Sequence, residues 1–415
     1  MPNGHQPPYL LRMRVEGFRS LASVEVAFSP LTVLVGPNGA GKSNLLDVIR
    51  FLSDSARFDI GETLRLRGGF ERVAFRAEPP TKQILIHVDT SVTRYSKPTV
   101  PDEYELILKK APRSRSLGMP GVARTETLTF KRTGGRGRRI TLTGERLVVD
   151  YDAAPRLRPA TSQTPSQLTL NNDTLALATL PKLGDQQGGQ EVAALAQLFE
   201  SFRVVDIDVR AARQPSAVGR HSAPEPLRDD ASNLAANLYS LFTTHPEDFD
   251  RLVRDAKRSV PGLTGIEFEA VGGSGPAVAL VLVEQGLRDK TYLAEASFGT
   301  IRVLALLALF YDPNPPRLTC IEEIDHGLHP DALDVIVDCM RQATTKTQVI
   351  ATTHSPSLVN RLRPNELIVC ERRADGSSAI PAISADEVRK MEAELGADFG
   401  LGELWFSGAL SRGRE

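Results

Sequence analysis

The sequence predicts an α/β fold with a glycine-rich loop between strand and helix, an antiparallel β lobe and a helical insertion. The segment LTVLVGPNGAGKSNLLDVIRFL, Leu31 to Leu52, begins as a β-branched apolar run and continues, after the glycines, with the spacing of an amphipathic helix. In the last third of the chain, short apolar strands alternate with helices. That alternation is typical of a parallel sheet covered on both faces.

The glycine-rich turn GPNGAGKS, which runs from Gly36 to Ser43, fits the phosphate-binding pattern GxxxxGK[ST]. Its glycines allow backbone N–H groups to approach phosphate oxygens, and the following helix directs its positive end to the same place. Lys42 can reach the β- and γ-phosphates, and the Ser43 hydroxyl is the expected Mg²⁺ ligand. A glycine-rich turn without a ligand is the alternative. The strand–loop–helix context favours a P-loop nucleotide site.

Composition limits the classes of protein that fit. The chain has 415 residues, which allows two or three domains or one large domain with an insertion. A net charge of −1 excludes a polycation that coats nucleic acid. The three cysteines, Cys320, Cys339 and Cys370, lack metal-ligand spacing and favour a reduced, cytoplasmic location. The longest apolar run, Ile301 to Phe310, is too short to span a membrane, so we expect no membrane segment.

The first half of the chain is expected to be rich in strands. Alternating or β-branched segments predict strands at Leu10–Val15, Ser23–Phe28, Ile84–Val88, Tyr104–Leu108, Thr125–Phe130 and Ile140–Leu142. The insertion that follows is expected to be mostly helical. Its elements are a helix at Glu191–Phe202, a strand at Phe202–Val209, and helices at Asp230–Phe242 (capped by Ser232) and Phe249–Val260. Strands at Ile266–Ala270 and Val278–Val283 are expected directly after the insertion.

The last third carries the apolar elements of the parallel sheet. They are a helix at Ile301–Phe310, a strand at Leu318–Ile321, a helix at Leu333–Gln342, strands at Gln348–Thr352 and Glu366–Cys370, and a helix at Glu387–Glu394. The expected domains are therefore residues 1–155 (loop and β lobe), 156–265 (helical insertion) and 266–415 (C-terminal half of the nucleotide-binding core).

Two carboxylates follow the strand that ends at Ile321. One acid can hold Mg²⁺ and the next can act as a general base toward water, so we assign Glu322 to the metal and Glu323 to the base. Alone, the pair could equally be two exposed acids at a strand end. His354 follows another strand and could contact the γ-phosphate, although an isolated histidine is more often structural.

A second anion site is predicted at the helix N-terminus formed by Ser297-Phe298-Gly299-Thr300. Because one triphosphate rarely needs two such sites, this one is expected to serve the nucleotide of a second subunit. The basic segment Lys131–Arg139 has two interpretations that remain open: a solvated hairpin tip, or a contact to the phosphate backbone of DNA.

Taken together in chain order, the segments GPNGAGKSN, SFGTIR, CIEEIDHGLHP and ATTHSPSLV resemble an ABC-type ATPase head. The resemblance is close to the branch that holds SMC, RecF and OLD-type proteins, and within it to the compact AAA-21 group of predicted ATPases. The segments VEGFRSL, DDASNLAANL and LGELWFSGAL extend the resemblance over most of the chain.

The resemblance implies a homodimer in which each ATP lies between the phosphate loop of one chain and the Ser297 segment of the other. The implied ligands in one chain are Gly36, Asn38, Gly39, Ala40, Gly41, Lys42, Ser43, Asn44, Glu322, Glu323 and His354, with Ser297 and Gly299 from its partner. Some positions depart from the pattern. The transporter signature LSGGQ is absent, and Ile324 replaces the usual proline after the second acid.

The resemblance also implies a function: a Mg²⁺- and ATP-dependent molecular switch that controls a separate effector protein, in the setting of anti-phage defence. The alternative is a RecF-like ATPase for DNA repair or recombination that acts directly on DNA. A transporter subunit would need LSGGQ and a membrane partner. An OLD-type nuclease would need a further acidic metal-binding domain after His354, and no such acidic cluster follows.

Overall fold

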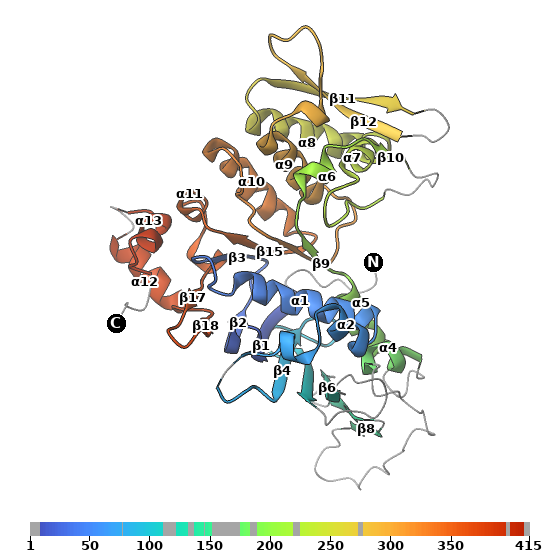
Figure 1. Cartoon of the computed structure of the whole chain (residues 1–415), viewed down its shortest axis with the longest axis vertical. Helices are drawn as coiled ribbons and strands as arrows, with labels where there is room; N and C mark the ends of the chain where they lie inside the picture. Colours follow the sequence, from blue (N-terminus) through green and yellow to red (C-terminus); the bar gives the residue numbers. More distant parts are fainter. Residues whose placement is uncertain are drawn as a thin grey trace. The chain divides into compact units, whose positions relative to one another are not determined.

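The computed structural model describes residues 9–76, 78–110, 122–131, 137–144, 146–151, 175–182, 189–218, 225–272, 277–395 and 399–410 (Figure 1). The chain divides into two compact units, each assembled from segments that are distant in sequence. The first unit comprises Met1–Pro30, Gly36–Phe202 and Ile368–Ser384, and the second comprises Leu31–Val35, Arg203–Leu367 and Ala385–Glu415. The consecutive domains 1–155, 156–265 and 266–415 stay a prediction.

The first unit contains a seven-stranded sheet in the order β2-β1-β4-β5-β6-β7-β8, antiparallel throughout. Its strands are β1 Leu10–Phe18, β2 Leu21–Ala27, β4 Gln83–Thr90, β5 Asp102–Lys110, β6 Val122–Lys131, β7 Gly137–Thr143 and β8 Arg146–Tyr151. Burial alternates along β1 and β5, as expected for strands with one face toward a core. The predicted antiparallel lobe is confirmed; β8 was not predicted.

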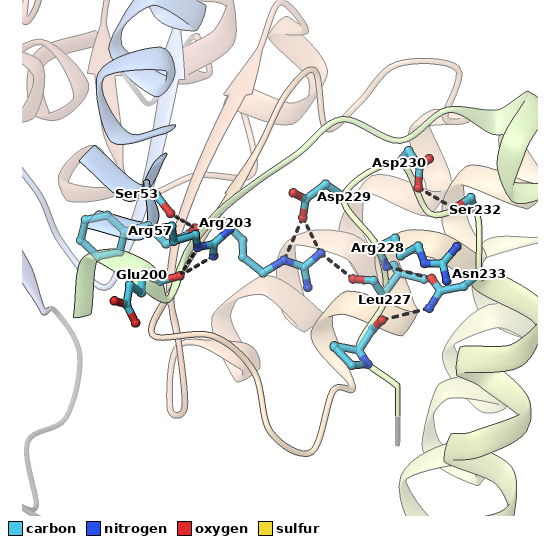
Figure 2. A network of polar contacts seen from close by, with 12 residues as sticks. Ser53, Arg57, Glu200, Arg203, Leu227, Arg228, Asp229, Asp230, Ser232 and Asn233 are labelled. Atoms are coloured by element: carbon cyan, nitrogen blue, oxygen red, sulfur yellow. Dashed lines mark hydrogen bonds and ion pairs between the residues drawn. The ribbon is translucent and has the colours of Figure 1, made fainter. Parts of the chain in front are cut away.

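Helices and a short hairpin complete this unit. They are α1 Lys42–Arg57, α2 Ile60–Leu66, α3 Phe70–Val73, α4 Ala176–Thr179, η2 Leu180–Lys182 and α5 Gly189–Glu200, with the hairpin β17 Glu371–Arg372 and β18 Ser378–Ala379. The last turns of α1 are fixed to the end of α5. Ser53 Oγ donates to the carbonyl of Phe202 at 3.0 Å. Arg57 Nε donates to the carbonyl of Glu200 at 3.1 Å; both side chains are drawn in Figure 2.

A buried carboxylate joins β6 to the start of α4. The Glu126 side chain accepts hydrogen bonds from the Ala176 backbone N–H at 2.6 Å and the Tyr104 hydroxyl at 2.9 Å, and Arg124 Nη1 lies 3.7 Å away. Burial raises the pKa of Glu126 to about 7. The folded state therefore holds a proton on this group over a pH range in which the unfolded chain has lost it.

The contribution of Glu126 to the free energy of unfolding is expected to be complete below pH 4.5, its ordinary pKa, and to fall as the pH rises to about 7. A shift of this size corresponds to about 3 kcal/mol. We expect Glu126→Gln, which cannot ionise, to remove this part of the pH dependence. Urea unfolding at several pH values measures it, with Glu103→Gln on the neighbouring strand as the control. If the free energy of unfolding differs between the wild type and Glu126→Gln by the same amount at every pH, the prediction is contradicted.

The second unit is built on a five-stranded sheet in the order β16-β3-β15-β14-β9. The strands are β16 Leu367–Val369, β3 Leu31–Val35, β15 Gln348–Thr353, β14 Leu318–Ile321 and β9 Phe202–Val205. The central pairs, β3 with β15 and β15 with β14, are parallel. Every residue of β3, β14 and β15 is buried, which explains the continuous apolar runs and confirms the predicted parallel sheet.

Helices and a smaller sheet surround this core. The helices are α6 Val209–Ala212, α7 Leu234–Thr244, α8 Pro246–Ser259, η4 Leu293–Glu295, α9 Phe298–Phe310, α10 Pro330–Ala343, α11 Pro356–Val359, η5 Pro364–Glu366, α12 Ala385–Leu395 and α13 Leu401–Phe406. The small sheet has β10 Ser216–Ala217, β11 Leu263–Val271, β12 Ala277–Glu284 and β13 Thr291–Tyr292. Within the described residues, no helix is long and apolar enough to cross a membrane.

Two local predictions in this unit are wrong. The strand expected to reach Val209 ends at Val205, because the Asp208 side chain caps α6 immediately afterwards. The helix expected from Asp230 begins only at Leu234, and its N-cap residue is Asn233 rather than Ser232. Asp230 accepts the Ser232 N–H and so favours a local turn over a helix (Figure 2).

Candidate nucleotide-binding site

The phosphate loop lies in the first unit, directly before α1. Gly41 is the N-cap residue of α1 with φ +102°, and Gly39 has φ +80°, so both adopt backbone conformations that disfavour other residues. Gly36 packs against Cys370, the residue before β17. A Cβ added to Gly36 would lie 2.2 Å from the Cys370 carbonyl oxygen. At Gly41 an added Cβ would lie 2.1 Å from Ser378 Oγ. Close packing therefore requires glycine at Gly36 and Gly41, and the backbone conformation favours glycine at Gly39.

A hydroxyl cluster supports the base of the loop. Ser20 Oγ and Ser378 Oγ share a buried hydrogen bond of 2.7 Å, and Asn44 Nδ2 donates to Ser20 Oγ at 2.6 Å. Arg372 Nη1 also donates to the Gly39 carbonyl at 3.1 Å. Ser20 falls in the segment VEGFRSL that carried the resemblance, whereas Ser378 and Arg372 gave no signal in the sequence.

Lys42 occupies the interior of this loop. Only 5% of the residue is exposed, and its ammonium donates to the carbonyls of Gly36 at 2.8 Å and Pro37 at 3.1 Å. Within the loop Ala40 is buried, whereas Asn38, Gly39 and Ser43 are exposed. A buried ammonium, glycine N–H groups and the start of a 16-residue helix fit the phosphate chain of a nucleotide.

The remaining predicted residues follow strands of the parallel sheet in the second unit. Thr353 at the end of β15 lies opposite Val35 at the end of β3, and Ile321 at the end of β14 lies opposite Ala351 of β15. Gly36, Glu322 and His354 are the residues that follow these three strands in the chain. The three sequence motifs therefore begin at the carboxyl edge of one sheet, where open α/β sheets bind their ligands.

Glu323 has an unusual backbone. Its φ of +45° is in the left-handed region, which costs a residue with a side chain about 1–3 kcal/mol unless its surroundings hold it there. The Glu323 N–H donates to Thr352 Oγ1 at 2.9 Å, and Arg302 Nη2 donates to the Glu323 carbonyl at 2.6 Å. The Glu323 side chain is 54% exposed and lies 3.7 Å from His326 Nδ1. Its carboxylate is thus accessible while its backbone is fixed.

A cavity of about 600 Å³ adjoins these acids. Its lining residues come from the segment after β9, the start of α9 and the loop after β14, and they include Asp206, Arg210, Arg213, Phe298, Arg302, Glu322, Glu323 and His326. Water can therefore reach the Glu323 carboxylate from this side of the unit.

The predicted second anion site lies at the N-terminus of α9. Ser297 is the N-cap, and its Oγ accepts the Thr300 N–H at 3.1 Å. The Phe298 ring lies 5.1 Å from the His326 ring, and a Cβ on Gly299 would come within 2.7 Å of the Gly327 carbonyl oxygen. The start of α9 therefore packs directly on the loop that follows Glu323.

His354 lies between β15 and α11 and is half-buried. The next residue, Ser355, caps α11 by accepting the Leu358 N–H at 3.3 Å. The C-terminal helix α13 lies directly on α11: the Gly402 N–H donates to Asn360 Oδ1 at 2.7 Å, and a Cβ on Gly402 would be 2.0 Å from the Pro356 carbonyl oxygen. Gly402 of the segment LGELWF thus allows α13 to pack closely on the helix after His354.

Two predicted features concern metal and DNA. In the described part of the chain, no three His, Cys, Asp or Glu side chains are grouped so as to hold a metal ion. In nucleotide sites Mg²⁺ takes one or two protein ligands together with phosphate oxygens and water, so Ser43 and Glu322 stay the predicted ligands.

Residues 132–136 of the basic segment Lys131–Arg139, the predicted DNA contact, lie outside the described residues. The strands β6 and β7 flank them, with Lys131 opposite Gly137.

A family model described as "AAA domain, putative AbiEii toxin, Type IV TA system" (AAA_21) matches residues 31–360, the span from the phosphate-loop strand past His354. The chain belongs to this family. The predicted membership of the SMC, RecF and OLD-like branch of ABC-type ATPases is confirmed.

Relatives and solved structures agree with this placement. The AAA_21 chain is 29% identical over 205 residues to the DNA replication and repair protein RecF of Beutenbergia cavernae. The matched region covers 46% of the AAA_21 chain and 47% of the RecF protein. It is 30% identical over 103 residues to the OLD nuclease of Thermus scotoductus. This match covers 19% of the AAA_21 chain and 20% of the nuclease. The chain thus spans about half or less of the length of these curated relatives.

One solved structure, described as the SmcHead bound to the C-winged helix domain of ScpA, matches with a TM-score of 0.53 and 16% identity. The match covers 90% of the AAA_21 chain and 97% of the chain in the solved structure. It confirms the predicted fold, a P-loop ATPase of the ABC-head type.

Proposed function

We propose that this AAA_21 protein binds and hydrolyses ATP with Mg²⁺ and works as a switch that dimerises when ATP is bound. The observation that carries the proposal is the shared carboxyl edge of β3, β15 and β14, from which the phosphate loop, His354 and the two acids all begin. Parallel strands place the residues after their carboxyl ends near a common ligand.

In the proposed mechanism each residue has a separate task. The glycine N–H groups of the loop and the Lys42 ammonium bind the phosphates, and Ser43 with Glu322 would hold Mg²⁺, which supplies positive charge to the developing phosphate oxygens. Glu323 accepts a proton from the attacking water. His354 would contact the γ-phosphate and respond to its loss.

Ser297 and Gly299 complete the site of a second copy of the chain in this proposal. Ser297 is exposed at the N-terminus of the 13-residue helix α9, and Gly299 has no side chain to block an approaching phosphate. A face-to-face homodimer then contains two equivalent sites, as two-fold symmetry requires.

Mixing of inactive variants tests this arrangement. Ser297→Arg and Lys42→Ala are each expected to be inactive alone, because every homodimer site lacks one half. In an equal mixture, heterodimers have one complete site, so ATPase activity should return to about a quarter of the wild-type value for random pairing.

The control mixture combines the double variant Lys42→Ala/Ser297→Arg with Ser297→Arg. No complete site exists in that mixture, so no activity is expected. If the mixture of single variants stays inactive although native mass spectrometry detects heterodimers, the shared site is refuted.

The output of the switch is proposed to be control of a separate effector protein, in anti-phage defence. The family description names a putative toxin of a toxin–antitoxin system, which supports a partner-directed role. Hydrolysis can shift the protein between states only through a difference in nucleotide affinity between them, and open and closed dimers provide two such states.

The second candidate is an ATPase that acts directly on DNA, which the RecF relatives favour. The basic segment Lys131–Arg139 would supply contacts to the phosphate backbone. Replacement of its five basic residues by Ser then distinguishes the two candidates. A salt-dependent affinity for duplex DNA that weakens on replacement favours direct action, whereas unchanged or absent DNA binding favours the effector.

A further inference from the structure

We propose that Arg302 is a positioning residue that holds the backbone of Glu323 in its active conformation. This inference rests on the proposed role of Glu323 as general base. Arg302 lies in α9, little more than one turn after Ser297. Its Nη2 donates to the carbonyls of Glu322 at 2.9 Å and Glu323 at 2.6 Å, and its Nη1 approaches the Ile207 carbonyl at 3.4 Å.

The burial of this arginine indicates a specific task. Arg302 is 3% exposed, although the helix could bury any apolar residue at that position. A buried charge is costly unless its donors are satisfied, and here Nη1 and Nη2 meet main-chain oxygens after two different strands, β9 and β14, while Nε has no partner among the described residues. The planar guanidinium can span these oxygens because its donors form a rigid fork.

The environment of Arg302 contains both opposing and supporting charges. Burial lowers the pKa of Arg302, while the carboxylates of Asp206, Asp325 and Glu323 act in the opposite direction. These three acids come from the loops after β9 and β14, so the guanidinium lies between both loops. The arginine therefore links the two loops with hydrogen bonds as well as with charge.

The contacts of Glu323 show what Arg302 contributes. The left-handed Glu323 residue is held on its N–H side by Thr352, on β15, and on its carbonyl side by Arg302 and the His326 N–H at 3.0 Å. Among the residues that the structure describes, the side chain of Arg302 is the one that donates to this carbonyl from another element. Without it, the Glu323 peptide can rotate and redirect the carboxylate.

The position of Arg302 in α9 gives this contact a second consequence. The same helix presents Ser297 to the proposed partner nucleotide at its N-terminus and fixes Glu323 with Arg302. Any shift of α9 on binding a partner's phosphate is then transmitted to the base of its own chain. The two sites of the dimer would be coupled through this helix.

Arg302→Met tests the role, because methionine fills much of the same volume without donors. A small misplacement of a catalytic group costs up to about 10²-fold, so we expect single-turnover hydrolysis to slow by about 10- to 100-fold. The ATP dissociation constant should stay within about twofold, since the hydrogen bonds of Arg302 go to the carbonyls of Ile207, Glu322 and Glu323. Arg302→Lys should recover part of the rate.

Arg203→Met is the matched control. Arg203 also donates to a main-chain carbonyl of the second unit, that of Leu227, and pairs with Asp229 (Figure 2), but it does not contact Glu323. Equal loss of hydrolysis rate in the two variants would mean that lost stability alone explains the Arg302 effect, and would overturn the proposal.

The decisive comparison is the double variant Arg302→Met/Glu323→Gln. If Arg302 acts through Glu323, adding Arg302→Met to Glu323→Gln should change the rate by less than about twofold. A further slowing as large as that in the wild-type background would refute the positioning role. Failure of the wild-type chain to hydrolyse ATP would instead refute the proposed function, so the two failures are distinguishable.

Discussion

Glu323→Gln should slow ATP hydrolysis by about 10²- to 10⁴-fold, the contribution of a positioned general base. Glutamine keeps the size of the side chain, and the backbone contacts of residue 323 to Thr352 and Arg302 do not involve the carboxylate. ATP affinity should therefore stay close to that of the wild type. Phosphate release measures turnover, and titration with a fluorescent ATP analogue measures binding.

Glu247→Gln serves as the control for this variant, because Glu247 is an exposed acid in the first turn of α8. It should hydrolyse ATP at the wild-type rate. Turnover of Glu323→Gln within a few-fold of the control would contradict the assignment of the base. Glu322→Gln would then be the variant to test, since that acid follows the same strand.

Lys42→Ala is expected to lower ATP affinity by about 10- to 100-fold, because hydrogen bonds to charged groups contribute about 1.5–3 kcal/mol each. Alanine also removes the contacts from the ammonium to the carbonyls of Gly36 and Pro37, so the loop loses its internal anchor. Isothermal titration measures the affinity. Exposed Lys82 in the same unit provides the control variant, Lys82→Ala, which should bind ATP normally.

An unchanged dissociation constant for Lys42→Ala would show that the loop does not bind the phosphates. Circular dichroism of both lysine variants separates the expected loss of affinity from a loss of folding, because a misfolded Lys42→Ala would lose ellipticity as well as affinity.

Much of the fold could be predicted from local patterns. The strand–loop–helix of residues 31–52 has alternations and glycines that are independent of distant residues, and the structure reproduces it as β3 and α1. The same holds for the apolar strands β14 and β15, whose lengths match the predicted runs to within a residue. Because each motif follows its strand directly, the position of each motif after a strand of the parallel sheet was also predictable, whereas the order of the strands in the sheet was not.

Contacts between distant segments could not be predicted. Ser378 reaches the hydroxyl of Ser20 across more than 350 positions of sequence, and neither residue has a periodicity that would mark it. The left-handed backbone of Glu323 depends on Thr352 and Arg302, which are themselves ordinary residues of a strand and a helix. The arginine at position 302, within an otherwise apolar helix, is the sequence feature by which the contact to Glu323 could have been found.

The two element boundaries that the sequence analysis misplaced, the end of β9 and the start of α7, have a common cause. At Ser232 and after Val205, short polar side chains bind nearby backbone N–H groups and compete with the regular element. Hydrophobic periodicity does not detect this competition, because it depends on which of several polar residues forms the hydrogen bond.

Light scattering of Glu323→Gln, with and without Mg²⁺ and ATP, tests the central claim of an ATP-dependent homodimer most directly. The slow variant should retain ATP, so the mass should change from the 45.2 kDa of one chain to twice that value when ATP is added. The variant Lys42→Ala/Glu323→Gln should keep the mass of one chain. A Glu323→Gln protein that binds ATP and shows the same mass with and without it would contradict the account.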